Sequence, residues 1–594
     1  MTMRRAGITV VAMGAAWVSG AQEKATNIVV EVEARVMAEV NDLPETIFLN
    51  VPNVSLRKQG EGSPQADMSI RGAPFSSSGY LLGGVAMRNA QTEHWQFDVP
   101  LPDLWFDAPM LLTGLDRFRR SPGHPSGSVA LELAPLTENE RRIAGGGGEK
   151  GLAFANTYVT ETEAFGKTIG AASAFASFDR SDRTDGYKDN YLTRATAGGR
   201  VGVVNDAVQG DVLMSYSWKE FGARGFYGTS PAYPAKEEIR ELTVMGSLRV
   251  MEDEQQVSRL TALWKRVDDI YLLDRDNPSF YLNEHTSDFI ALHGETRRMR
   301  TEHWSIDLRA DGEAEIIESE SLGDHTRARG SFAVLPNYHL NAVTFTAGGA
   351  LDVFTTDTPA WLPAAGIEWA MTDNQTLFLS YTESVRQPSY TEFNYNSPAS
   401  LGNTGLKRQR TRTTELGWKG AAERFNWHTA VFYENNNNVV DWIQYARDAR
   451  WTSVNLQKLE TFGIAVDGNV RVTALTEFAF DALVLYKTCD TDFFASRYAF
   501  DYPDATVGLT LRQHLTHDVF IRFRQGVSKF AGNPARQGDD WFWDMGVDAQ
   551  WHMPWMTGLT LGAGVNNALD DTFQIYPGQV SAGRRFFVSA AYQW

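Results

Sequence analysis

The feature that most constrains this chain is an alternation of apolar and polar side chains that recurs from Glu149 to Trp594. Successive side chains of a strand point to opposite faces, so this pattern predicts strands with one apolar face. In the clearest example, one face carries Trp541, Trp543, Met545, Val547, Ala549, Trp551 and Met553, and the other carries Phe542, Asp544, Gly546, Asp548, Gln550 and His552. A soluble antiparallel sheet shows such a pattern on one or two strands, whereas its repetition over most of a chain favours a closed barrel.

The two faces differ in chemistry, which indicates what surrounds the barrel. One face is Trp, Phe, Val and Leu, and the other includes Asp, Gln, His, Arg and Thr, as expected for lipid outside and a hydrated or filled lumen inside. Trp541, Trp551 and Trp555 stand near strand ends and fit an interfacial aromatic girdle. At roughly 20 residues per strand and connection, this region holds about 22 strands. A barrel of that width has a lumen that something must fill.

The last strand of the chain has an apolar face formed by Phe586, Val588, Ala590, Tyr592 and Trp594. This ending resembles the C-terminal signal by which bacterial outer-membrane barrels are recognised for insertion. Alternation alone does not say what covers the apolar face, so a soluble edge strand is the alternative for this segment taken by itself. In a barrel, we expect Trp594 to end the last wall strand and to pair with the first, near residues 151–161.

The N-terminus predicts export. Arg4 and Arg5 precede an apolar stretch from Ala6 to Val18, and small residues follow up to Ala21, which is typical of a cleaved signal peptide over residues 1–21. No internal apolar run reaches the roughly 18 residues of a transmembrane helix. The formal charge of −18 disfavours nucleic-acid binding, and one cysteine excludes an intramolecular disulfide.

Three regions follow the signal peptide. Residues 22–40 are polar with one apolar patch and predict a flexible tether, residues 41–145 resemble a small α/β globule, and residues 146–594 form the predicted barrel. The glycine run Gly145–Gly148 at the boundary predicts a linker or a tight turn. The globule is the obvious candidate to fill the lumen.

Several motifs, taken in order, resemble the TonB-dependent outer-membrane receptors. Residues 67–72 are similar to the "xxIRG" strand of that family's plug, and residues 82–87 to its "LxDGV" strand without the usual acidic residue. Further similar passages are residues 111–117 and 126–133 at the end of the plug, and residues 384–393, 402–407, 414–419 and 565–571 in the barrel. The resemblance implies a membrane β fold: a 22-stranded antiparallel transmembrane β-barrel with an N-terminal α/β plug domain inside the lumen.

The same resemblance implies partners. The apolar patch Ile28, Val29, Val30, Glu31 and Val32 is similar to a TonB box, and an extended peptide of this kind can add a strand to the sheet edge of a partner. The alternative is a first strand of the plug. The implied partners are TonB of the inner-membrane energy-transducing complex, outer-membrane lipid and the barrel assembly machinery. The implied location is the outer membrane of a Gram-negative-type bacterium.

By analogy with the family, two plug loops should face a small-molecule or metal-chelate ligand. The expected aromatic contacts are Phe75, Tyr80, His94 and Trp95, and the expected hydrogen-bonding contacts are Ser76, Ser77, Ser78, Asn89, Gln91 and Gln96. The alternative for each is packing of the plug against the wall. Arg71 is expected to pair with a barrel carboxylate.

The function implied is active uptake of a scarce solute, a ferric siderophore or cobalamin. The alternatives are a passive porin-like channel and a carbohydrate importer of the same family. We expect no enzyme activity, cofactor, metal site or catalytic residue. Gly166-Lys167-Thr168 lacks the first glycine of a phosphate loop and has a strand-like setting, and neither a Gly-x-Ser-x-Gly nor a His-Glu-x-x-His motif is present.

Overall fold

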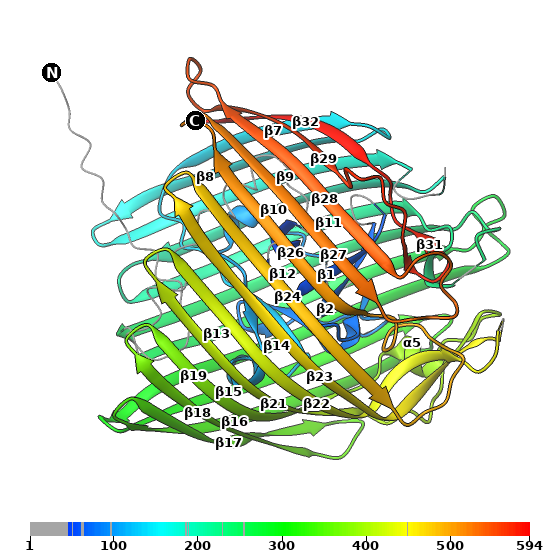
Figure 1. Cartoon of the computed structure of the whole chain (residues 1–594), viewed down its shortest axis with the longest axis horizontal. Helices are drawn as coiled ribbons and strands as arrows, with labels where there is room; N and C mark the ends of the chain where they lie inside the picture. Colours follow the sequence, from blue (N-terminus) through cyan, green and yellow to red (C-terminus); the bar gives the residue numbers. More distant parts are fainter. Residues whose placement is uncertain are drawn as a thin grey trace.

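The computed structural model describes residues 46–49, 51–60, 64–94, 98–183, 187, 189–228, 230–253, 256–447 and 449–594. These residues form a closed antiparallel barrel of 22 wall strands around an N-terminal α/β plug, as the sequence predicted (Figure 1). Among them, no helix combines the length and the apolar composition needed to cross a membrane. The predicted signal peptide, tether and TonB box lie outside the described residues.

The wall strands follow one another around the barrel in chain order. They are β7 Glu140–Gly148, β8 Ala153–Phe165, β9 Thr168–Asp182, β10 Tyr191–Val204, β11 Val208–Gly222, β12 Lys236–Asp253, β13 Gln256–Leu272, β14 Leu282–Thr301, β15 Trp304–Ser319, β16 His325–Leu340, β17 Val343–Phe354, β18 Ala360–Thr372, β19 Gln375–Arg386, β21 Gln409–Ala422, β22 Phe425–Gln444, β23 Trp451–Thr473, β24 Thr476–Cys489, β26 Pro503–His514, β27 Val519–Phe530, β28 Trp541–His552, β29 Leu559–Asn566 and β32 Arg585–Gln593. Two short strands, β20 Ser400–Leu401 and β25 Ala495–Ser496, extend the pairing of β23 and β22.

The two ends of the barrel differ in their connections. At one end, called here the short-turn end, the strands are joined by tight turns such as 166–167 and 341–342. At the other, the long-loop end, they are joined by longer segments such as 223–235, 387–408, 490–502 and 567–584. The long-loop end is therefore where connecting segments can gather over the lumen.

The predicted alternation of the wall is confirmed in β28. The side chains of Trp541 and Trp543 are 44% and 45% exposed on the outer face, whereas those of Asp548 and Gln550 are 3% and 1% exposed. Arg522 on β27 donates to the buried carboxylate of Asp548, with Nε 2.9 Å from Oδ1. Inward polar groups are thus paired inside the wall, which keeps the cost of burying them low.

Closure of the barrel corrects two expectations. The glycine run Gly145–Gly148 is not a linker or turn but the second half of β7, which pairs with β32 from Arg142↔Gln593 to Gly148↔Phe587 (top of Figure 1). The last strand therefore pairs with β7 and not with residues 151–161, most of which belong to β8. The glycines permit close approach: a Cβ on Gly146 would lie 2.4 Å from the carbonyl oxygen of Val588.

The plug fills the lumen with a small α/β unit. Its elements are α3 Thr46–Leu49, β1 Val54–Gln59, β2 Gln65–Ile70, η1 Phe75–Ser77, β3 Ser78–Leu82, β4 Val85–Ala86, η3 Asp103–Trp105, β5 Met110–Leu112, α4 Gly114–Arg120 and β6 Gly127–Leu131. Strands β4-β3-β6-β5 form one sheet, and β1 and β2 form a separate hairpin. The plug shares its core with the wall, because Trp105 packs edge-on against Phe175 of β9 and donates to Ser173 at 2.9 Å.

The seam between β7 and β32 should depend on the missing side chain of Gly146. We expect Gly146→Val to destabilise the folded barrel by about 1–3 kcal/mol, because the new Cβ clashes with the backbone of β32. Samples are heated to a series of temperatures before gel electrophoresis. The measurement is the temperature at which half of the protein no longer migrates as the fast, folded form. The same substitution at Gly312, whose added Cβ would meet nothing within 4 Å, is the control. Equal midpoints for the two variants would contradict this account of the seam.

Candidate functional site

The β1–β2 hairpin of the plug reaches the long-loop end, where two loops bind it directly and a third is linked to it through Asp501. Arg57 of β1 forms an ion pair with Asp501 in loop 490–502, and its Nη1 donates to the Asp501 carbonyl at 2.7 Å. Asp501 also pairs with Arg536 in loop 531–540. Arg57 donates in addition to the carbonyl of Ile575 in loop 567–584. A single buried carboxylate and the guanidinium beside it therefore join the plug to the loops above it.

Asp67, opposite Arg57 in the hairpin register, makes a second set of links. Its carboxylate lies 2.6 Å from Nδ1 of His94, in the plug loop that follows β4. It also accepts a hydrogen bond from the phenol of Tyr576 in loop 567–584. The two carboxylates thus hold the hairpin, one plug loop and the outer loops in one hydrogen-bonded unit.

Two aromatic rings of the plug and three of the loops contact one another beside these ion pairs, and we call them the aromatic floor: Phe75, His94, Tyr227, Tyr498 and Tyr576. Phe75 and His94 stack with ring centroids 4.2 Å apart, and Tyr498 meets Phe75 edge-on at 5.0 Å. Tyr576 meets Tyr498 at 5.8 Å, and Tyr227 lies 5.9 Å from His94. Such edge-to-face and stacked pairs are favourable beyond the area they bury.

Two small hollows of about 10 and 20 Å³ flank Tyr498 and Tyr576. The larger is lined by Trp451 and Arg497, and the Arg497 guanidinium lies 5.8 Å from the Trp451 ring. Gln59 and Gln579 also line it, and the Gln59 Oε1 and Gln579 Nε2 atoms are buried without a hydrogen-bond partner among the described residues. A hollow of this size holds one water, so the loops lie closed over the hairpin in this structure.

The tyrosines of the floor are neutral hydrogen-bonding groups. Burial raises the pKa of Tyr498 to about 12. Burial, followed by the nearby Asp67 carboxylate, raises the pKa of Tyr576 well above its ordinary value. Both phenols therefore remain protonated over the physiological pH range and present apolar faces with a polar tip.

The plug loop that carries His94 is anchored to the wall on its other side. Gln91 donates to Asp269 of β13 at 2.6 Å, and Glu93 lies 3.2 Å from the guanidinium of Arg386 at the end of β19. Burial raises the pKa of Glu93 to about 7, although Arg386 opposes the shift. The Asn89 side chain accepts from the Thr92 backbone at 3.0 Å, which closes the turn.

The structure brings together only part of the predicted contact set. Phe75 and His94 lie on the aromatic floor, whereas Tyr80 is buried in the plug core and its phenol lies 3.2 Å from the Asp98 carbonyl. Of the three serines, Ser77 bonds Gln409 of the wall strand β21, Ser78 accepts from the Ile70 backbone within the plug, and Ser76 is 7% exposed. Trp95 and Gln96 lie outside the described residues. A role of these residues in binding stays a prediction.

Arg71 has the structural role that the sequence predicted. Its Nη2 lies 2.9 Å from Oε1 of Glu415 on β21, and both side chains are buried. The guanidinium also lies 4.6 Å from the centre of the Phe432 ring on β22. Arg71 therefore fixes the plug to the wall.

Sequence reasoning missed Tyr227, Tyr498 and Tyr576, which lie in three separate connections between wall strands. A signal was present, since each is an aromatic residue within a turn-rich segment near the end of a strand. What the sequence did not contain was the position of the hairpin beneath them. Within the described part of the chain, no group of three or more His, Cys, Asp or Glu side chains could hold a metal ion.

A family model described as the β-barrel of TonB-dependent receptor-like proteins matches residues 138–568. The chain belongs to the TonB-dependent receptors. The match covers the wall from β7 to the end of β29, so the family is identified by the barrel and not by the plug motifs alone.

Three solved structures have a similar fold over nearly the whole length of this chain. A mutant ferric enterobactin receptor of Pseudomonas aeruginosa is 14% identical with a TM-score of 0.76, covering 97% of this chain and 100% of its own. The FrpB iron transporter of Neisseria meningitidis is 13% identical with a TM-score of 0.75, covering 96% and 99%. The siderophore receptor PirA of Acinetobacter baumannii is 12% identical with a TM-score of 0.72, covering 93% and 96%.

Loss of the Asp501 carboxylate should loosen the loops from the plug. We expect Asp501→Asn to cost about 3–5 kcal/mol, because it leaves the guanidinium groups of Arg57 and Arg536 buried without their anion. The measurement is the rate of limited proteolysis within loop 490–502. Asp504→Asn is the matched control, since Asp504 pairs with Lys529 in a partly exposed ion pair worth about 0–1 kcal/mol. Equal cleavage rates in the two variants would show that Asp501 does not hold loop 490–502 to the plug.

Proposed function

We propose that this protein is an outer-membrane receptor that binds a ferric siderophore at its long-loop end and imports it with energy delivered by TonB. The observation that carries the proposal is the aromatic floor with its arginines, which lies on top of a plug that fills the lumen of a TonB-dependent receptor barrel. A plug packed against the wall fits gated uptake better than a passive pore.

The difference between the barrel ends supports an orientation. Outer-membrane barrels have short periplasmic turns and longer extracellular loops. The long-loop end, with the aromatic floor, would then face outside, and the short-turn end would face the periplasm. The N-terminal segment with the predicted TonB box precedes the plug, as an element presented to a periplasmic partner must.

The chemistry of the floor supports the ligand class. Siderophore complexes present flat, electron-rich chelating groups around a metal and often carry negative charge. Tyrosine rings offer apolar faces to such groups, neutral phenols offer hydrogen bonds, and the guanidinium of Arg497 offers a charge partner beside Trp451. The similar structures described as a ferric enterobactin receptor, a siderophore receptor and an iron transporter are consistent with this class. Cobalamin is the alternative within the same mechanism.

Truncation of the floor should weaken ligand binding. We expect Tyr498→Ala to lower the affinity for a ferric catecholate siderophore about tenfold, because Tyr498 contacts both Phe75 and Tyr576 and its loss opens the floor. Fluorescence quenching of the purified receptor gives the affinity. Tyr486→Ala is the control, because Tyr486 is 69% exposed on the outer wall. If both variants bind like the wild type, the floor is not the ligand site.

Energy coupling is tested separately from binding. Deletion of residues 28–32 should abolish accumulation of radioactive ferric siderophore in whole cells while binding at the cell surface persists, because only the contact with TonB is lost. Deletion of residues 34–38 shortens the tether equally and should leave most uptake intact. Uptake that survives the first deletion would favour a diffusion channel, and loss of surface binding would point to a folding defect.

A further inference from the structure

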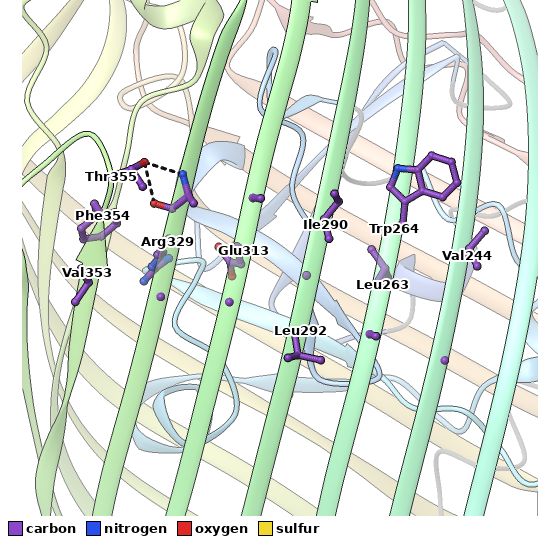
Figure 2. Close-up of a pocket in the computed structure, with 17 residues that line it drawn as sticks. Val244, Leu263, Trp264, Ile290, Leu292, Glu313, Arg329, Val353, Phe354 and Thr355 are labelled. Atoms are coloured by element: carbon purple, nitrogen blue, oxygen red, sulfur yellow. Dashed lines mark hydrogen bonds between the residues drawn. The ribbon is translucent and has the colours of Figure 1, made fainter.

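Two buried carboxyl groups near the long-loop end of the wall face each other and not an arginine. Elsewhere in the lumen an inward carboxylate commonly lies beside a guanidinium group, as Glu313 of β15 does directly opposite Arg329 of β16 (Figure 2). Glu237 of β12 and Asp269 of β13 are only 3% and 2% exposed. Among the described residues, no lysine or arginine forms an ion pair with either of them. A proton must therefore take the place of the missing cation.

The pair lies above the hydrocarbon layer of the membrane. The outward side chains at the same height are charged: Glu238 pairs with Arg240 on β12, and Arg266 pairs with Asp268 on β13. Such charges are costly on a lipid-facing surface and are tolerated beyond it. This part of the wall therefore belongs to the extension that carries the long loops.

The strand register makes the two carboxyl groups neighbours. Asp269 stands opposite Ile239 and Glu237 stands opposite Tyr271, so the two are diagonal neighbours on the lumen face. They share a hydrogen bond, which two carboxyl groups can form only when one of them carries a proton. Burial, followed by the adjacent Asp269, raises the pKa of Glu237 well above its ordinary value, and burial also raises the pKa of Asp269.

Each carboxyl group also holds one segment of the candidate site. Tyr227 of loop 223–235 donates to Oε2 of Glu237 at 2.7 Å. Gln91, in the plug loop after β4, donates to Oδ2 of Asp269 at 2.6 Å. Tyr227 and His94 of that plug loop meet on the aromatic floor, with ring centroids 5.9 Å apart. The shared proton therefore lies at the junction of an outer loop, a plug loop and the wall.

The other groups that face the pair do not replace this proton. Lys219 of β11 is committed to the plug, with Nζ 2.7 Å from Oδ2 of Asp98. His285 of β14 stands opposite Asp269, but burial lowers its pKa, so its ring is neutral at pH 7 and above. Tyr271 of β13 adds a phenol, which carries no positive charge. Repulsion between two ionised carboxylates would thus meet no nearby compensation.

We propose that Glu237 and Asp269 form a pH-sensitive latch, closed by one shared proton, that fastens loop 223–235 and the plug loop after β4 to one point of the wall. Loss of the proton leaves two buried carboxylates side by side, and their mutual repulsion is relieved when a segment moves away and admits water. The latch goes beyond the proposed uptake and does not depend on which solute is imported.

The direction of the pH effect follows from the two states of the latch. In the open latch, the carboxyl groups have their ordinary pKa, about 4.3 for a glutamate, whereas the closed latch keeps its proton to higher pH. The closed state is therefore most favoured at low pH. Between the two pKa values it loses population by up to about tenfold for each unit of pH increase.

Hydrogen–deuterium exchange of the full chain in detergent, without any ligand, measures how often the latch opens. The reporter amides are those of Ala223, which donates to the Ala235 carbonyl at 2.8 Å, and of Glu93, which donates to the Asn89 carbonyl at 3.0 Å. After correction for the intrinsic effect of pH on exchange, we expect their protection to fall at least about tenfold between pH 6 and pH 8. Glu93 itself has a pKa of about 7, so the amide of Ala223 is the decisive reporter.

Amide variants replace the shared proton permanently. Glu237→Gln supplies an N–H donor to Asp269 and keeps an acceptor for Tyr227, so protection should stay at its low-pH level throughout. Asp269→Asn does the same from the other side of the pair and is the second variant. Glu238→Gln, on the outer face of the same strand, is the matched control and should keep the pH dependence of the wild type. Fast migration in an unheated gel confirms that each variant is folded.

Three results would overturn the latch. They are protection of the Ala223 amide that does not change with pH in the wild type, amide variants that follow the wild-type curve, and loss of the pH dependence in Glu238→Gln. Because no ligand is present in the experiment, each of these results would leave the proposed siderophore uptake untouched.

Discussion

The structure depends on arginine–carboxylate pairs buried between plug and wall. Glu132 of the plug and Glu295 of β14 are both shared by Arg120 of α4 and Arg259 of β13, and burial of Glu132 is outweighed by the two guanidinium groups, which lower its pKa to about 2. Burying such charges is costly, and well-packed apolar residues would often be as stable. A charged interface differs from an apolar one in that water can replace its contacts when the plug shifts. An interface of this kind would hold the plug firmly and still allow its displacement, as the proposed uptake requires.

The wall was predictable because its requirement is local. Each strand must face lipid on one side and paired polar groups on the other. The exposed Trp541 and the buried Asp548, a few positions apart on one strand, show this requirement directly in the sequence. The glycine run of β7 was misread for the same reason, since a local pattern cannot distinguish glycine needed for a turn from glycine needed for the close approach of β32. Arg71 was assigned correctly because a charge between plug and lumen needs a partner.

The candidate site was predictable only in part, because its members meet across the whole chain. Arg57 and Asp501 are separated by 444 positions, and Asp67 and Tyr576 by 509. No pattern of neighbours reveals such pairs. The sequence identity to similar structures is only 12–14% over nearly the full length. This low identity is consistent with a wall set by local patterns and a site set by residues far apart in the chain. A barrel needs only alternation to persist, whereas the loops that carry the tyrosines of the aromatic floor are free to change.

The position of Arg57 has a mechanical consequence. β1 is the first strand of the described plug, so a pull from the N-terminal side reaches it before it reaches the sheet β4-β3-β6-β5. An antiparallel hairpin loaded at one end opens one residue pair at a time, which takes far less force than shearing a sheet whose strands give way together. Once the first pairs of the hairpin have opened, Arg57 would be withdrawn from Asp501 and from the Ile575 carbonyl, and loops 490–502 and 567–584 would lose this link to the plug. Release at the long-loop end would precede any opening of the lumen.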